Sequence, residues 1–250
     1  MDPEDVIFLL FEKRLPNRQE SQDFRHELAQ RAERMPTGAL RVLESLTPAS
    51  GHPMDWLSIG IQALGLAETT GDIRADGLNL ISRMPELMAT IFRLRGGRGL
   101  PEVASEPERG MVENFVHLLG MDGVDANRMI RTLRVFLVLH MDHGGGNLST
   151  FTGKAVASGW ASLYGSISSA MNALSGPLHG RANQSCLEFV QRIGTSDEAE
   201  VESFVRKELA ARRPIYGFGH AVLCAEDPRA AAQFKLGEEI CPDDPNFQTV

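Results

Sequence analysis

Cysteine is scarce in this 250-residue chain, and its three cysteines, Cys186, Cys224 and Cys241, form no Cys-x-x-Cys pair. An odd number of widely spaced thiols argues against a disulfide framework and a zinc site, and is typical of reduced thiols in the cytosol. Long apolar runs are also missing, since none approaches the roughly 18 residues of a membrane-spanning helix. No secretory segment precedes Asp2. We therefore expect a soluble, cytoplasmic protein with no membrane partner.

Positive charge is in short supply as well. The chain has 25 Lys and Arg against 33 Asp and Glu, a formal net charge of −8. A chain of this charge has no overall basic field to recruit nucleic acid or an anionic membrane surface. Any anionic ligand would have to be held by local arginines.

Alternation of apolar and polar residues at period two is too short anywhere to indicate a strand. Apolar residues instead recur at helical spacing, so we predict an all-α chain. The expected helices cover residues 3–11, 18–34, 37–46, 52–66, 76–95, 107–119, 125–139, 147–158, 160–174, 178–193, 197–212 and 227–240.

Three of these helices carry more specific expectations. The second half of the sequence contains a segment, 160–174, that is rich in Ala, Ser and Gly, which favours tight packing in the interior or at a subunit interface. Pro85 should break or kink its helix, because proline removes a backbone donor. The helix after His52 should carry one shared apolar face, made of Trp56, Ile59, Ala63 and Leu66.

Three histidines, His143, His179 and His220, stand in glycine-rich segments. These segments read His-Met-Asp-His-Gly-Gly-Gly-Asn, Ser-Gly-Pro-Leu-His-Gly and Tyr-Gly-Phe-Gly-His-Ala. Glycine weakens helices, so its presence beside an imidazole indicates backbone bends or close approach to a bound molecule. We infer imidazoles gathered from several helix ends around one small ligand.

The residues alone leave other interpretations open. His143 could cap a helix end, and His179 could belong to a turn. His140, Asp142 and His143 could be metal ligands, but no closed ligand set accompanies them. The basic segment 93–98 could cradle a phosphate or form a solvated turn.

The motifs at 140–149, 170–184, 217–223 and 227–229, in this order and at these separations, closely resemble citrate synthase, in the form shared by mitochondria and some bacteria. The resemblance implies a multi-helical fold with a large helical domain over 1–176 and the start of a small, substrate- and CoA-binding domain over 177–250. It also implies a bacterial cytoplasmic homodimer that meets through its interior helices.

The resemblance further implies condensation of acetyl-CoA with oxaloacetate to citrate and CoA, through an enol or enolate and hydrolysis of citryl-CoA. His179 would donate to the thioester oxygen where charge develops. Its ring should be neutral, which placement at a helix N-terminus would favour. Ser149 would hold the other ring nitrogen, and His220 would act as general acid on the keto oxygen.

Substrate contacts follow from the same resemblance. His143, Asn147 and Arg229 would bind oxaloacetate, and the guanidinium fork of Arg229 matches the geometry of a carboxylate. If the resemblance is set aside, Arg229 is expected to be a surface residue in the first turn of a helix. The backbone of the loop that follows Arg213 would receive the adenine end of CoA, through Pro214, Ile215, Gly217 and Gly219. Acetyl-CoA is a co-substrate, and no metal or prosthetic group is implied.

The sequence also departs from the family pattern. Cys224 stands where relatives often have an arginine for a CoA phosphate, and Gly144 replaces a customary glutamate. No aspartate stands in the motif of the catalytic base, so the resemblance implies a fragment that lacks both family termini and has little activity alone. Two alternatives are a 2-methylcitrate synthase that uses propionyl-CoA and a non-catalytic citrate synthase-like binding protein.

Overall fold

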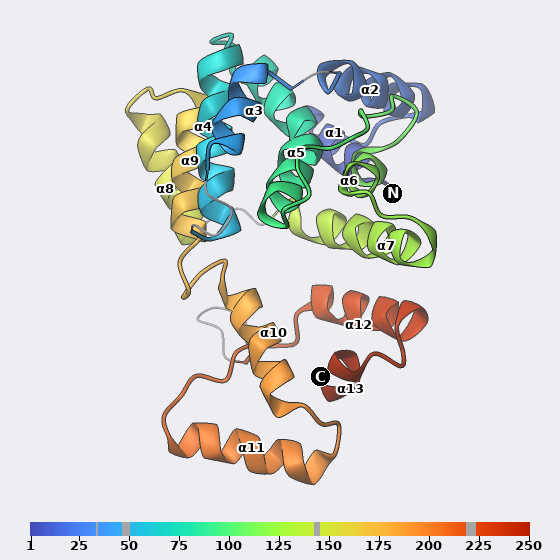
Figure 1. Ribbon diagram of the computed structural model, residues 1–250, viewed down its shortest axis with the longest axis vertical. Coiled ribbons are helices and arrows are strands. Elements are labelled where there is room, and N and C mark those ends of the chain that lie inside the picture. The colour runs from blue at the N-terminus through green and yellow to red at the C-terminus, as the bar shows by residue number, and fades with distance from the viewer. Residues whose placement is uncertain (34, 47–50, 143–145, 219–223) are drawn as a thin grey trace. The chain divides into compact units, whose positions relative to one another are not determined.

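The computed structural model describes residues 1–33, 35–46, 51–142, 146–218 and 224–250 (Figure 1). These residues form thirteen helices and no strand, which confirms the all-α prediction. The helices are α1 Pro3–Glu12, α2 Arg18–Arg31, α3 Thr37–Glu44, α4 Pro53–Glu68, α5 Ile73–Arg95, α6 Met111–Leu119, α7 Gly123–His140, α8 Leu148–Ser158, α9 Leu163–Leu174, α10 Ala182–Ile193, α11 Glu198–Ala210, α12 Pro228–Ile240 and α13 Pro245–Thr249.

Local capping chemistry explains where many helices begin. The Asp72 carboxylate accepts bonds from the Arg74 and Ala75 backbone at 2.8 Å each, and Asp197 caps α11 in the same way. Proline occupies the first position of α1, α4, α12 and α13, where its missing N–H is not needed. The prediction missed α13, a five-residue helix capped by Asp244, and placed the start of α6 four residues too early.

The chain divides into two compact units, Met1–Ser175 and Gly176–Val250, here called unit 1 and unit 2. Unit 1 holds α1 to α9, and unit 2 holds α10 to α13. The main core of unit 1 lies among α3, α4, α5 and α9. Its fully buried side chains include Leu43, Ile61, Leu64, Leu87 and Tyr164.

The small-residue helix α9 packs against α4 and α8, which confirms the expected tight interior packing. Ser58 and Ser168 exchange bonds across the α4–α9 contact: each hydroxyl donates to the other's carbonyl, at 3.1 and 3.0 Å. A Cβ on Gly65 would lie 2.5 Å from the Tyr164 Cβ, so glycine is what lets Tyr164 enter the core.

Two expectations about helices in unit 1 do not hold in full. Ile59 and Leu66 are 40% and 87% exposed, because α4 buries the wider face that carries Trp56, Ile61 and Leu64 instead. Helix α5 continues through Pro85, so the helix does not break there, whereas a kink at Pro85 stays a prediction.

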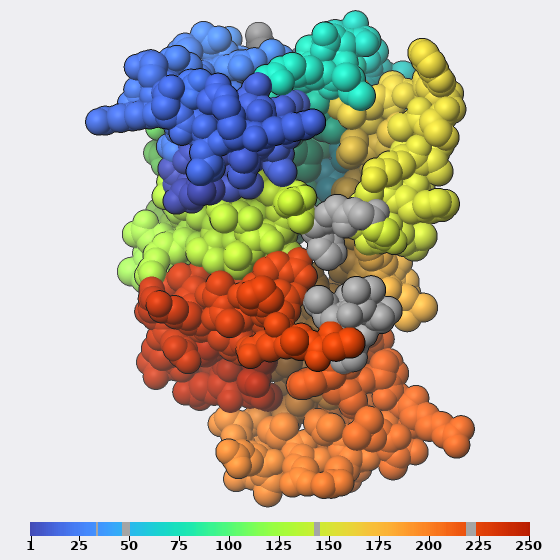
Figure 2. Space-filling model, turned by 180° about the vertical axis from the view of Figure 1, so that it is seen from behind, coloured from blue at the N-terminus to red at the C-terminus, as the bar shows by residue number. Residues whose placement is uncertain are grey.

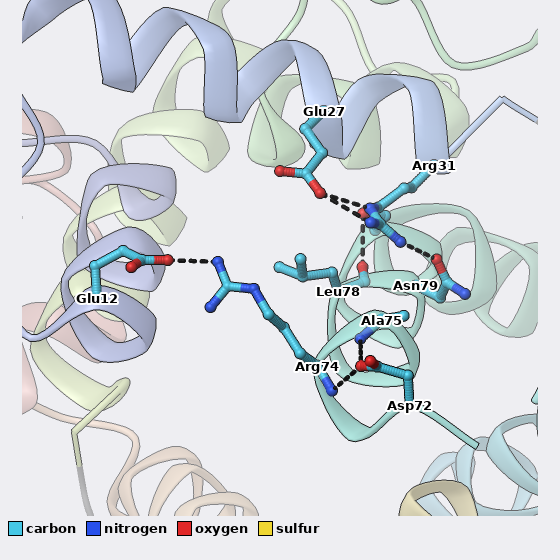
Figure 3. A network of polar contacts seen from close by, with 9 residues as sticks. Glu12, Glu27, Arg31, Asp72, Arg74, Ala75, Leu78 and Asn79 are labelled. Atoms are coloured by element: carbon cyan, nitrogen blue, oxygen red, sulfur yellow. Dashed lines mark hydrogen bonds and ion pairs between the residues drawn. The ribbon is translucent and has the colours of Figure 1, made fainter. Parts of the chain in front are cut away.

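Polar contacts join α1 and α2 to α5 (Figure 3). Arg31 donates to Asn79 at 2.7 Å and to Glu27 at 2.8 Å, so one guanidinium group bridges α2 and α5. Arg74 of α5 pairs with Glu12 at the end of α1. These contacts fix the first two helices on the long helix α5.

Unit 2 is built from α10, α11, α12 and α13 and buries few residues completely. Phe189 of α10 packs edge to face on Phe204 of α11, with ring centroids 5.6 Å apart. Gly237 of α12 allows Phe247 of α13 to pack closely against it. In the described parts of both units, no helix combines the length and the apolar character that crossing a bilayer requires.

Candidate functional site

The predicted site residues fall in different parts of the structure. His143, Gly219 and His220 lie outside the described residues. Asn147 and Ser149 belong to unit 1, whereas the remaining site residues belong to unit 2: His179, Pro214, Ile215, Gly217 and Arg229.

Asn147 and Ser149 meet at the start of α8. The Asn147 Oδ1 accepts bonds from the Thr150 backbone N–H and from the Ser149 hydroxyl, at 2.8 Å each. Asn147 is thus the N-cap of α8, which explains why the helix begins directly after the first histidine motif. The expected bond between Ser149 and the His179 ring stays a prediction.

His179 lies in the turn that leads into α10. Its backbone N–H donates to the Gly176 carbonyl at 3.0 Å, and its carbonyl accepts a bond from Ala182 at 3.0 Å. Helix α10 starts at Ala182, so the prediction that a helix begins at residue 178 is wrong. The Ser-Gly-Pro sequence forms a turn first, and the half-buried imidazole stands ahead of the helix rather than on it.

The loop 214–218, expected to receive CoA, lies along α10. The Cys186 thiol of α10 donates to the Tyr216 carbonyl at 3.8 Å, and a Cβ on Gly217 would lie 3.4 Å from the Cys186 sulfur. Gly217 has φ +92°, a conformation that favours glycine. Burial raises the pKa of the Cys186 thiol, so the thiol stays protonated and can donate. Sequence reasoning missed this role of Cys186, because nothing local in the sequence pairs positions 186 and 216.

Arg229 stands at the start of α12, beside its N-cap Asp227. Its Nε and Nη2 donate to the Asp227 carboxylate at 3.0 and 2.6 Å, and its backbone N–H donates to the same group at 2.9 Å. The hydrogen bond with Asp227 raises the pKa of Arg229, so it is always cationic. The Arg229 side chain is half-buried, with 26% of its surface exposed. Its guanidinium fork points at the Asp227 carboxylate.

The basic segment 93–98 covers the end of α5 and part of an exposed turn, and its role as a phosphate cradle stays a prediction. The Arg93 side chain, 7% exposed, donates to the Leu100 carbonyl at 3.1 Å and to Glu102 at 2.9 Å. Arg98 donates to the Leu119 carbonyl at 3.2 Å. Arg93 therefore ties the end of α5 to the loop that follows it, and Arg98 ties that loop to the end of α6.

A cluster that sequence reasoning did not single out lies between α10 and α11. The Glu208 side chain, only 7% exposed, pairs with Arg213 at 2.5 Å and with Arg192 at 3.4 Å. Arg213 is the main cause that lowers the pKa of Glu208, so the carboxylate is ionised near neutral pH. Arg213 directly precedes the loop 214–218 in the chain. Glu208 and Arg192 line the same hollow as Pro214 and Tyr216 of that loop.

The metal interpretation of the first histidine motif finds no support in the described residues. His140 stacks on Phe136, with ring centroids 4.2 Å apart, and its Nδ1 lies 2.7 Å from the Phe136 carbonyl oxygen. Nowhere in the described ranges do three His, Cys, Asp or Glu side chains form a group that could hold a metal ion.

Comparison with known proteins gives the family. The family model described as citrate synthase, C-terminal domain, matches residues 1–250. Mitochondrial citrate synthase of Citrus maxima is 32% identical over 269 aligned residues, which cover 99% of this chain and 55% of that protein. The crystal structure of citrate synthase from Thermotoga maritima is similar with a TM-score of 0.84 and 29% identity, over 99% of this chain and 65% of that one.

An archaeal structure shows the same fold. Citrate synthase from Thermoplasma acidophilum, solved as a ternary complex with carboxymethyl coenzyme A and oxaloacetate, is similar with a TM-score of 0.86 at 22% identity, over 100% of this chain and 66% of that one. The chain therefore belongs to the citrate synthase family. It spans about 55% of the length of the mitochondrial relative.

Proposed function

We propose that this chain supplies the oxaloacetate- and CoA-binding part of a citrate synthase active site, which condenses acetyl-CoA with oxaloacetate. One observation carries the proposal beyond family membership: α10 holds both the turn of His179 and the loop 214–218. The Ala182 N–H bonds the His179 carbonyl, and Cys186 bonds the Tyr216 carbonyl, so one helix ties the catalytic donor to the CoA loop. A shared rigid support is what precise positioning of two substrate-binding groups requires.

The chemistry assigned to the histidines follows from where charge develops. Removing a proton from the thioester methyl group builds negative charge on the carbonyl oxygen, and His179 would donate to that oxygen. His220 would polarise the oxaloacetate keto group and protonate the alkoxide that forms. Ser149 would orient the His179 ring. No aspartate of the sequence stands in the family's base motif, so the proposal assigns no base.

Oxaloacetate would be held by His143, Asn147 and Arg229. Arg229 is a half-buried cation at the start of α12, and a guanidinium fork suits a carboxylate of the substrate. The backbone of Pro214, Ile215, Gly217 and Gly219 would receive the adenine end of CoA. No metal or prosthetic group enters this chemistry.

A homodimer is part of the proposal. No residue of α8 is fully buried, and Leu148, Phe151 and the nearby Trp160 are 56%, 67% and 96% exposed. Figure 2 shows α8, in yellow, spread over the surface of unit 1. Exposed apolar surface of this kind is typical of an interface, and a second copy of the chain would cover it. A cytoplasmic location stays a prediction.

The test measures CoA release from acetyl-CoA and oxaloacetate with a thiol-reactive dye, beside the Citrus maxima enzyme. Because no aspartate of these 250 residues stands in the base motif, we expect this chain alone to release CoA about 10²–10⁴-fold more slowly than that relative, yet in dependence on both substrates. His179→Ala should abolish it, whereas the exposed His26→Ala should not. CoA release at the same rate without oxaloacetate, or at the same rate in His179→Ala, would refute the proposal.

The same assay separates the alternatives. The relatives found by comparison are citrate synthases, so neither a 2-methylcitrate synthase nor a binding-only protein is favoured. Faster CoA release from propionyl-CoA than from acetyl-CoA would indicate the first. Substrate binding without any release would indicate the second.

A further inference from the structure

Helix α7 of unit 1 buries very little of its surface. It contacts α6 and α1 (Figure 1), yet Ala126 is the one residue of Gly123–His140 that is fully buried. Its apolar side chains, such as those of Leu133 and Val138, are only half-buried. Apolar packing alone therefore specifies weakly how α7 is rotated about its axis and where it lies along that axis.

Arg134 gives α7 a more specific attachment. Its guanidinium group pairs with Glu113 in the first turn of α6 at 2.6 Å, and with Asp2, the N-cap of α1, at 3.4 Å. All three side chains are partly shielded from solvent, since Arg134, Glu113 and Asp2 are 42%, 19% and 30% exposed. One side chain of α7 thus contacts two other helices.

The carboxylates that Arg134 contacts belong to a closely packed junction of α1 and α6. The buried Glu4 carboxylate of α1 accepts a bond from the Met111 backbone N–H, at the start of α6, at 2.7 Å. A Cβ on Gly110 would lie 2.5 Å from the Glu113 Oε2 and 2.9 Å from the Glu4 Oε1, so glycine leaves room for both carboxylates. Arg134 therefore attaches α7 to a junction that is already fixed.

These ion pairs determine geometry more than stability. Partly exposed ion pairs stabilise a fold little. The Arg134 Nε is buried and has no hydrogen-bond partner among the described residues, which costs stability. Charged groups accept few alternative packings, so the pairs select one orientation of α7.

Helix α7 ends at His140, the first residue of the first histidine motif, 140–149. Arg134 lies six residues before that end, about 9 Å along the helix. We propose that Arg134 is a positioning residue for oxaloacetate, which fixes α7 and thereby places the motif that follows α7. The inference rests on the proposed function, which assigns residues of this motif to oxaloacetate. A displacement of about 1 Å is enough to weaken such substrate contacts.

The test measures the affinities of the whole chain for oxaloacetate and for CoA by calorimetric titration. Arg134→Gln should weaken oxaloacetate binding about five- to tenfold, because coupling through packed elements changes affinities by this order. The affinity for CoA, which the proposed function assigns to the loop 214–218, should stay within about twofold. Arg134→Lys keeps the charge and should restore part of the loss.

Glu113→Gln separates positioning from a direct effect of charge. The change removes a negative charge, so simple attraction of the oxaloacetate dianion would make binding tighter. Positioning instead predicts binding that is about two- to tenfold weaker, because Arg134 loses a partner. The double variant with Arg134→Gln should bind no more weakly than Arg134→Gln alone, since both changes break the same contact.

Arg128→Gln is the matched control, because Arg128 is a 53% exposed arginine of α7 that lies 3.9 Å from Asp125 on the same helix. It should change neither affinity, and thermal melts should show which variants are folded. Should Arg134→Gln not fold, Arg134→Lys and Glu113→Gln decide by the same criteria.

Three results would overturn the positioning role and leave the proposed function intact. These are unchanged oxaloacetate binding in Arg134→Gln, an equal loss of CoA binding in that variant, and tighter oxaloacetate binding in Glu113→Gln. Failure of the unmodified chain to bind oxaloacetate would refute the proposed function itself.

Discussion

At the scale of single residues, Gly65 controls how α9 enters the core. Tyr164 is fully buried, and its hydroxyl donates to Glu68 at 3.2 Å across the contact with α4. Gly65→Ala would place a methyl group 2.5 Å from the Tyr164 Cβ, so we expect the free energy of unfolding to fall by about 1–3 kcal/mol. Chemical denaturation measures this loss.

Gly38→Ala is the control for that change. Gly38 is a helical glycine, and no heavy atom lies within 4 Å of the position that an added Cβ would take. Alanine there should therefore raise the free energy of unfolding by about 0.4–1 kcal/mol. Equal effects at the two positions would contradict the packing described for Gly65.

Asp76 is a buried carboxylate that links stability to pH. Burial alone would raise the pKa of Asp76, but bonds from the Thr70 N–H and hydroxyl, at 2.7 Å each, and from Thr69 outweigh burial and lower it. A lowered folded-state pKa gives stability that is present above the unfolded value of about 3.9 and is lost as the pH falls through the folded value. We expect Asp76→Asn to reduce the free energy of unfolding at pH 7 by about 1–3 kcal/mol and to flatten its decline below about pH 4.

The control for Asp76 is Asp125→Asn, since the Asp125 side chain is 81% exposed. Denaturation at a series of pH values compares the two variants. If the free energy of unfolding of Asp76→Asn declined with falling pH as steeply as that of the unmodified chain, other carboxylates would be responsible for the decline.

The sequence predicts residues whose signal is local. Glycines flanking His179 marked the bend that the structure shows there, and a polar side chain at Asn147 marked the start of α8. The contacts of Cys186 with Tyr216, and of Glu208 with Arg192, join positions far apart in the chain. No local pattern encodes such pairs, so the sequence alone could not reveal them.

At the scale of elements, α8 provides a test of what Asn147 does. As the N-cap of α8 its side chain should contribute about 1 kcal/mol, so Asn147→Ala should lower the melting temperature. Asn147→Asp keeps a capping oxygen and should preserve stability, but its negative charge should weaken binding of the dianion oxaloacetate. Melting curves and oxaloacetate titrations separate the two roles, and normal oxaloacetate binding by Asn147→Asp would remove Asn147 from the substrate site.

The sequence predicts where helices form better than it predicts which face of each helix is buried. Periodicity and caps located twelve of the helices, because those signals lie within each helix. The apolar residues Ile59 and Leu66 share a side of α4 that the chain leaves exposed, because the buried face is set by α3, α5 and α9. Pro85 did not end α5, since tertiary packing on both sides of the proline holds the helix together.

At the scale of the whole molecule, the exposed apolar residues of α8 predict self-association. We expect the chain to sediment as a dimer, and Phe151→Glu to weaken dimerisation at least about tenfold by placing a charge in the interface. Val124→Glu, a change at a 67% exposed position on α7, should leave the dimer intact. A chain that is monomeric at high concentration would contradict the proposed homodimer.

The most direct test of the account uses carboxymethyl coenzyme A, the ligand of the archaeal structure, in titrations with oxaloacetate present. Its carboxylate places negative charge where the acetyl thioester would form an enolate, so it probes the donor assigned to His179. We predict saturable binding that His179→Ala weakens about tenfold or more, while the exposed His26→Ala leaves it unchanged. An unchanged affinity for carboxymethyl coenzyme A in His179→Ala would contradict the central claim, which is that the His179 imidazole donates to the developing enolate.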